Sequence, residues 1–372
     1  MNFFLHKNTT ILVLAPIIIV ASITFGFWFK FEKNITGFFL IGETFKKSPF
    51  LDENKILIVK NEVGYDGQQF LSLAFDPLMN HEGTLEALDN PRYRAKRILL
   101  PLVSNFLSLG EYKLIPYVFV ALNSIGILAI FFLFYSIQKN KNSFYLLTLA
   151  IPGIWIVLRI STAEIIANTL ILTSYFFIQH KKVNTSFLFL MLACLTKETM
   201  IIFPVSYGLV FLIKKDFKKI FALAFFFIPF YIWHIYLIYK FGLGGDFDEF
   251  GNFTSPFYGV FKKWSDLIFL ENNKHEYLYF ILLNISIILL ITKLKYIYLN
   301  HIYLFGSSLI YISLFALSSS AIYDYHFSYN RVFIPVFIIL LLSFKDNITI
   351  FDKVFWFFST LSSIRIIYWV MK

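Results

Sequence analysis

Acidic and basic side chains gather in two neighbouring stretches of an otherwise apolar chain. The first stretch, NEVGYDGQQFLSLAFDP at 61–77, contains Asp66 and Asp76. The second stretch, LDNPRYRAKRILLP, places four cations within six residues: Arg92, Arg94, Lys96 and Arg97. A carboxylate can accept a proton from a reacting hydroxyl, and arginine forks bind phosphate oxygens in pairs. The two stretches therefore predict a general base, Asp66, beside a phosphate-binding cluster in which Arg94 and Arg97 are the first candidates.

The residues from Asp66 onward have the period of an amphipathic helix, with an apolar stripe opposite a polar stripe that holds Gln69 and Asp76. We expect this helix to lie at a membrane interface and to end at Asp76, just before Pro77. Asp66 has two compatible interpretations. It is the N-cap, with Gln69 completing a capping box, or it faces a cavity as a base whose pKa is raised by partial burial.

Composition indicates what must position these groups. The chain has 372 residues, of which 58% are hydrophobic and 15% charged, whereas soluble domains carry about 25% charged residues. Repeated apolar runs approach the roughly 17–25 residues of a membrane-crossing helix. We predict an all-α, polytopic integral membrane protein, a single transmembrane domain over 1–372 with about 10–12 membrane helices, some short or kinked. The net charge of +10 comes from cations that flank apolar runs, which indicates topology signals rather than nucleic-acid binding.

Lysines cluster in short connectors near 139–141, 181–182, 214–219, 293–295 and 345–353. Such connectors mark the cytoplasmic side. Residues 30–97 are then the first extracytoplasmic loop, with the amphipathic helix as a juxtamembrane element, and 242–275 are the second large one. This arrangement requires 98–110 to be a short helix that does not fully cross the membrane.

Further polar residues fall on the same predicted face. Lys197 and Arg331 are candidates to extend the phosphate site, although Lys197 and Glu198 could instead form a structural turn stabilised by local charge pairing, and Arg159 could pair with Glu164. Candidates for acceptor binding or support of the site are Gln69, Asp76, Glu198, Asp248 and His326. The Asp-x-Asp spacing at Asp248 lacks the rest of a calcium-ligand pattern. We predict no metal site and no required cofactor, and we leave dependence on a divalent metal open.

A family resemblance follows from these motifs. One membrane helix, a long outer loop with an Asp near a juxtamembrane helix, and then many helices resemble the GT-C superfamily of polyprenyl-phosphate-sugar glycosyltransferases. The pattern YDG…DP…YR…RILLP and the LTKET turn at 195–199 are similar to those of a group of bacterial membrane proteins. The resemblance covers about the first two hundred residues by motif and the rest by hydropathy. Many GT-C members carry an acidic pair in this loop, whereas Asp66 has no adjacent acid.

The resemblance implies a multi-pass protein of the bacterial inner membrane whose active site faces the extracytoplasmic side, and it implies an activity. A sugar would move, with inversion, from a polyprenyl-phosphate donor to a hydroxyl or amine of a cell-envelope glycan, lipid or protein. Asp66 would be the base, and the cations would hold the donor phosphate. Other classes remain open: a transporter or flippase for a lipid-linked or anionic substrate, a polysaccharide polymerase or ligase, and a structural membrane subunit.

Overall fold

The computed structural model of the protein describes residues 2–138, 143–242, 251–269, 274–344 and 349–372. The chain is 77% helical and nearly all-α, which confirms the predicted fold class at this level. Within the described residues, the only sheet is a parallel pair of two-residue strands, β1 (Ile41–Gly42) and β2 (Ile58–Val59).

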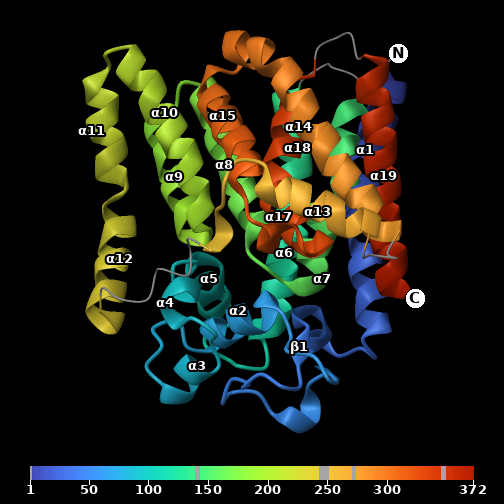
Figure 1. Cartoon of the computed structure of the whole chain (residues 1–372), viewed down its shortest axis with the longest axis vertical. Coiled ribbons are helices and arrows are strands. Elements are labelled where there is room, and N and C mark those ends of the chain that lie inside the picture. Colours follow the sequence, from blue (N-terminus) through green and yellow to red (C-terminus); the bar gives the residue numbers. More distant parts are fainter. Residues whose placement is uncertain (1, 139–142, 243–250, 270–273, 345–348) are drawn as a thin grey trace.

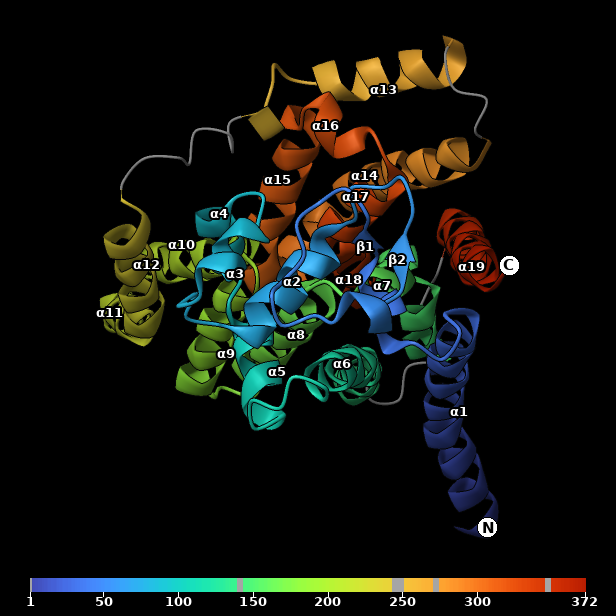
Figure 2. The same cartoon turned by 90° about the horizontal axis from the view of Figure 1, so that it is seen from below.

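The chain begins with α1 (Asn2–Lys30) and then forms a polar layer, residues 31–97. The other elements of this layer are η1 (Ile35–Phe39), η2 (Glu53–Lys55), α2 (Asp66–Phe75), α3 (Glu82–Glu86) and α4 (Pro91–Ala95). Figure 1 shows this layer gathered at one end of the helical bundle, and Figure 2 shows α2 running across the middle of that end. The segment predicted as the first large loop is therefore a folded layer of its own.

The rest of the chain forms the bundle. Its first half consists of α5 (Leu99–Leu107), α6 (Ile115–Ile137), η3 (Ser143–Ala150), α7 (Pro152–Ile160), α8 (Glu164–Gln179), α9 (Val183–Thr196), η4 (Glu198–Ile201) and α10 (Ile202–Ile213). Its second half consists of α11 (Phe217–Phe226), α12 (Ile228–Phe241), α13 (Tyr258–Phe269), α14 (Lys274–Asn300), α15 (Ile302–Leu317), α16 (Ser320–Tyr323), α17 (His326–Val332), α18 (Ile334–Leu342) and α19 (Ile350–Met371). In Figure 1, α11 and α12 stand at one edge of the bundle and α13 lies across it.

Three described helices are long and apolar enough to cross a membrane: Ile115–Ile137, Glu276–Asn300 and Ile350–Met371. The pair α11 and α12, bent by 45°, would make a fourth if it forms one span. Other apolar helices, such as α9 and α15, are shorter. The predicted number of about 10–12 membrane helices is therefore not confirmed.

Prolines explain much of this shortness. Pro116, Pro152, Pro229 and Pro335 lie within apolar runs of the sequence, and each stands at the first or second position of a helix. Proline lacks the N–H that a helix interior needs and fits the first turn. Pro152, Pro229 and Pro335 therefore each begin a new helix within an apolar run. The nine residues of α5 span only about 14 Å, which confirms that 98–110 contains a short helix.

Helix α2 has the predicted range but a different environment. Residues 67–75 are all buried, so both the apolar and the polar stripe of α2 lie inside the protein, and its place at a membrane interface stays a prediction. Its polar stripe faces protein: Gln68 Oε1 accepts a hydrogen bond from the Gly42 amide at 2.9 Å, and Gln69 Oε1 accepts one from the Asp89 amide at 3.2 Å. The polar layer covers this stripe, and α2 is a core element.

The two ends of α2 test the predictions that Asp66 is the N-cap and that Asp76 ends the helix. The N-cap is Tyr65, and it makes no side-chain capping bond. The predicted capping box at Asp66 is therefore wrong, because Asp66 is the first helical residue and its carboxylate points elsewhere. The helix ends at Asp76 as predicted. The Asp76 carboxylate accepts hydrogen bonds from the His81 amide at 2.8 Å and the Thr84 hydroxyl at 3.0 Å, so it fixes the following loop.

Close packing of α2 against α7 predicts the effect of one substitution. A Cβ on Gly67 would lie 2.1 Å from the Ile160 carbonyl oxygen and 2.8 Å from that of Phe39. Because backbone atoms must shift to admit it, we expect Gly67→Ala to destabilise the fold by about 1–3 kcal/mol and to lower the thermal midpoint in detergent. Gly208→Ala is the control, since its nearest heavy atom would be 3.9 Å away. Equal midpoints for the two variants would contradict this packing.

Candidate functional site

A cavity of about 910 Å³ lies where the polar layer meets the bundle. One end of it is charged and is formed by residues from α2, α4, the start of α8, the Lys197–Glu198 turn and α17. Another wall is apolar and includes Phe230 and Leu237 from α12 and Leu314 from α15. The cavity therefore combines a charged end with an apolar wall, which is the combination that an amphiphilic ligand would match.

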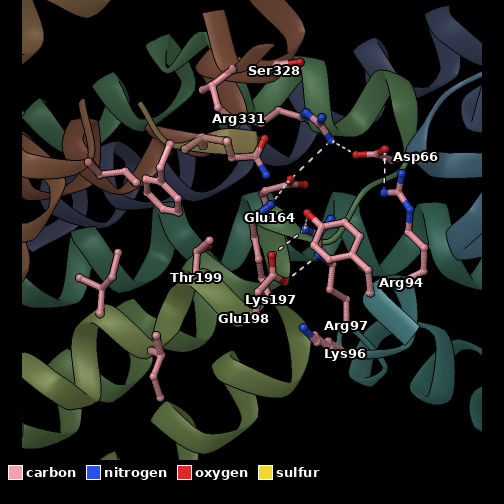
Figure 3. Close-up of a pocket in the computed structure, with 18 of the residues that line it drawn as sticks. Asp66, Arg94, Lys96, Arg97, Glu164, Lys197, Glu198, Thr199, Ser328 and Arg331 are labelled. Atoms are coloured by element: carbon pink, nitrogen blue, oxygen red, sulfur yellow. Dashed lines mark hydrogen bonds and ion pairs between the residues drawn. The ribbon is translucent and has the colours of Figure 1, made fainter. Parts of the chain in front are cut away.

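Asp66 joins two arginines at the charged end of this cavity. Its Oδ1 accepts a hydrogen bond from Arg94 Nη1 at 2.8 Å, and its Oδ2 accepts one from Arg331 Nη1 at 3.0 Å. Figure 3 shows the carboxylate between the two guanidinium groups. The Asp66 side chain is 20% exposed, whereas both arginine side chains are at least nine-tenths buried. The predicted base and two of the predicted phosphate-binding residues therefore meet directly.

Each of these arginines has further anchors. Arg94 donates from Nε and Nη2 to the two carboxylate oxygens of Asp89, at 2.8 and 2.6 Å. Arg331 donates from Nε to the Phe327 carbonyl at 2.9 Å and from Nη2 to the Tyr65 hydroxyl at 3.1 Å. Both guanidinium groups are thereby held in orientation, with Nη1 directed to Asp66.

Glu164 forms a second, deeper junction that the sequence analysis did not assign to the site. Its Oε1 accepts from Lys197 Nζ at 2.6 Å and lies 3.4 Å from Arg331 Nη1. Glu164 and Lys197 are only 3% and 6% exposed. The predicted pairing of Glu164 with Arg159 is wrong, because Arg159 donates to the Gly37 carbonyl at 2.9 Å and lies over the Phe31 ring. An acid at the start of an apolar helix was the available signal for Glu164.

Arg97 forms a two-point ion pair with Glu198. Its Nε and Nη2 donate to the two oxygens of that carboxylate at 2.7 and 2.6 Å, and Nη2 also contacts the Tyr93 hydroxyl. Local pairing between Lys197 and Glu198, the structural alternative for their turn, is therefore wrong: each residue takes its partner from another element. The turn is therefore bound to Arg97, which lies between α4 and α5, and to Glu164 at the start of α8.

The other described residues predicted to bind the acceptor or support the site are not found in the cavity lining. Gln69 and Asp76 support the polar layer through the hydrogen bonds described above and do not line the cavity. His326 lies in another buried cluster, where its Nδ1 is 2.5 Å from Glu276 Oε1, and Lys263 pairs with the same carboxylate at 3.4 Å. Asp248 lies outside the described residues.

The cavity is electropositive. Among the described residues, its lining includes six cations against three carboxylates, a formal excess of three positive charges. Burial alone would raise the pKa of the Asp66 carboxyl, but Arg94 and Arg331 outweigh it and hold that pKa well below its ordinary value. The predicted rise in pKa is therefore wrong for this arrangement, because a carboxylate paired with two guanidinium groups is a weak base.

Comparison with family models, curated proteins and solved structures finds no match for the chain. Within the described part of the chain, no group of three or more His, Cys, Asp or Glu side chains has an arrangement that could hold a metal ion.

The buried junction at Glu164 predicts a large effect on stability. Glu164→Gln leaves the buried ammonium of Lys197 without its carboxylate, so we expect a loss of about 3–5 kcal/mol in the free energy of unfolding. Adding Lys197→Met should recover part of this loss, because the unpaired charge is then removed. Thermal unfolding of purified protein in detergent measures both effects.

The control for this prediction is Glu86→Gln, which breaks an exposed pair with Lys46 and should change little. Equal midpoints for Glu164→Gln and Glu86→Gln would contradict a structural role for the junction. A double variant no more stable than Glu164→Gln alone would show that the unpaired lysine is not the cause.

Proposed function

We propose that the protein is a membrane glycosyltransferase that moves a sugar from a polyprenyl-phosphate donor to an extracytoplasmic acceptor, with inversion. The observation that carries the proposal is the convergence of Asp66, Arg94 and Arg331 in one cavity, although Arg331 is 265 residues from Asp66. Arg97 and Lys197 line the same cavity. A base and several phosphate-binding cations in one place are what this reaction needs.

The shape and polarity of the cavity support an amphiphilic donor. Pockets for small molecules usually have volumes of about 300–1,000 Å³, and this cavity is near the upper end of that range. Its cationic end suits a phosphate, and its apolar wall on α12 and α15 suits an isoprenoid chain. A polyprenyl phosphate combines both chemistries in one molecule.

The reaction assigns a role to each group. The acceptor oxygen or nitrogen attacks the anomeric carbon and forms the new glycosidic bond, while the bond from that carbon to the phosphate oxygen breaks. The bonding electrons go to the phosphate, which leaves as a monoester and needs no general acid. Arg94 and Arg331 stabilise its growing charge, and Asp66 takes the acceptor proton. A single displacement inverts the anomeric centre.

Arg97 and Lys197 have a different role in this proposal from that of Arg94. Arg97 donates hydrogen bonds from Nε and Nη2 to Glu198, and Lys197 forms an ion pair with the deeply buried Glu164. Both cations contribute positive charge to the cavity and fix the turn between α9 and η4. We therefore place Arg94 and Arg331, rather than Arg97, in direct contact with the phosphate.

The proposal places the protein in the bacterial inner membrane as a multi-pass protein, with membrane lipids around the bundle and the site on the extracytoplasmic side. The connector between α10 and α11, which carries Lys214 and Lys215, lies at the end of the bundle opposite to the polar layer (Figure 1). Short lysine-rich connectors favour the cytoplasm. The polar layer and the cavity then face outward, where a cell-envelope glycan, lipid or protein would supply the acceptor.

Loss of the proposed base should lower sugar transfer far more than it lowers stability, because Arg94 keeps Asp89 and Arg331 keeps Glu164 as charge partners. We expect Asp66→Asn to lower sugar transfer about 10²- to 10⁴-fold, measured in membranes with a panel of labelled polyprenyl-phosphate sugars. The matched control is Asp76→Asn, at the other end of α2 and outside the cavity, which should keep its activity. Full activity in Asp66→Asn would exclude Asp66 as the base.

The orientation is tested by single-cysteine labelling. Glu62 in the polar layer and Lys182 in the α8–α9 connector are both exposed, and the native Cys194 is buried. A membrane-impermeant maleimide applied to intact cells with a permeabilised outer membrane should label Glu62→Cys but not Lys182→Cys, which should react only after lysis. Labelling of both positions from the same side would rule out the proposed orientation.

A further inference from the structure

We infer that the Asp66 carboxylate occupies the anion-binding position of the cavity, and that the substrate phosphate replaces it between Arg94 and Arg331. Asp66 then becomes free to act as a base only when the donor is bound. This inference rests on the proposed function and adds to it that the phosphate displaces Asp66 from Arg94 and Arg331, which makes the basicity of Asp66 depend on donor binding. The shared chemistry is a phosphate group, carried either by a lipid or by free phosphate.

The first support is the convergence of two donors on one acceptor. Arg94 and Arg331 come from different parts of the chain, and each directs one N–H group, on Nη1, at the same carboxylate (Figure 3). Carboxylate and phosphate oxygens accept the same charge-assisted hydrogen bonds from guanidinium groups. A phosphate at this position can therefore satisfy both N–H groups that Asp66 now satisfies.

The second support is that both arginines keep their other anchors if Asp66 leaves. Arg94 remains bound to Asp89 through Nε and Nη2, and Arg331 remains bound through Nε and Nη2 to the Phe327 carbonyl and the Tyr65 hydroxyl. The two guanidinium groups are thus oriented in advance for an anion. Preorganised donors lose little freedom when a ligand binds.

The other ion pairs at the site do not share this arrangement. Exchange at Glu198 would cost Arg97 both of its carboxylate hydrogen bonds at once. Exchange at Glu164 would need a ligand to reach a carboxylate that is only 3% exposed. Asp66, by contrast, borders the cavity with one-fifth of its side chain exposed, so the exchange is most accessible there.

Electrostatics explains why the exchange is coupled to proton transfer. If Asp66 left without a replacement, Arg94 would keep only Asp89 and Arg331 only Glu164 as a carboxylate partner. Loss of a buried ionic contact is costly, so Asp66 stays bound to both arginines until another anion arrives. While it is bound, its affinity for a proton is low. Once the phosphate takes its place, the carboxylate loses its two cationic partners and regains basicity beside the acceptor. The excess of three positive charges around the cavity favours entry of the phosphate.

Binding measurements on the purified full-length protein in detergent test this inference without requiring transfer. The probes are farnesyl phosphate, farnesol and inorganic phosphate, titrated by calorimetry. Asp66 competes with the ligand for the two arginines. We therefore expect the affinity of Asp66→Ala and Asp66→Asn for farnesyl phosphate to exceed that of the unaltered protein by a factor of about ten or more. Asp89→Asn should bind it more weakly, since Arg94 loses its anchor, and Asp76→Asn should be unchanged.

The outcomes separate the two proposals. Tighter binding of farnesyl phosphate by both Asp66 variants, with no binding of farnesol, supports the exchange at a lipid phosphate. Equal affinity for inorganic and farnesyl phosphate, still increased by the Asp66 variants, supports the exchange but contradicts a lipid-linked donor. Unchanged or weaker binding in both Asp66 variants overturns the exchange while leaving the proposed transferase intact. Absence of phosphate binding in every form of the protein overturns both.

Discussion

The pairing of buried charges is the constraint on which the rest of this structure depends. Three carboxylates, those of Asp66, Glu164 and Glu198, hold the buried side chains of Arg94, Arg97, Lys197 and Arg331. Because an unpaired charge in this environment costs several kcal/mol, each pair must form when the chain folds. The partners come from distant segments: Arg97 and Glu198 are 101 residues apart, and Asp66 and Arg331 are 265 apart. The network therefore joins the polar layer to both halves of the bundle.

The same constraint shapes the cavity. The polar layer covers one end of the bundle, and the Lys197–Glu198 turn between α9 and η4 lies beneath it. The apolar residues of α12 and α15 form a wall beside these charges. An amphiphilic molecule matches both surfaces, whereas a wholly polar or wholly apolar ligand would leave one of them unsatisfied. This two-part lining is the physical basis for proposing a lipid-linked phosphate as the ligand.

Much of this could be predicted from local sequence. Hydropathy indicated a helical protein, the spacing around Asp66 indicated a helix ending at Asp76, and the brevity of α5 was required by the distribution of lysines. Local pattern could not show how charges pair, because pairing depends on tertiary contacts. For this reason Glu164 was assigned to Arg159 instead of Lys197, and the Asp66 pKa was expected to rise. The burial of α2 on both faces was missed because its polar stripe is satisfied by Gly42 and Asp89, residues outside the helix.

An experimental structure of the protein with bound farnesyl phosphate tests the central claim most directly. We expect density for the phosphate between the Nη1 atoms of Arg94 and Arg331, with the farnesyl chain along α12 and α15 and the Asp66 carboxylate turned away from both arginines. Phosphate density elsewhere in the cavity, with Asp66 still bound to Arg94 and Arg331, would contradict it.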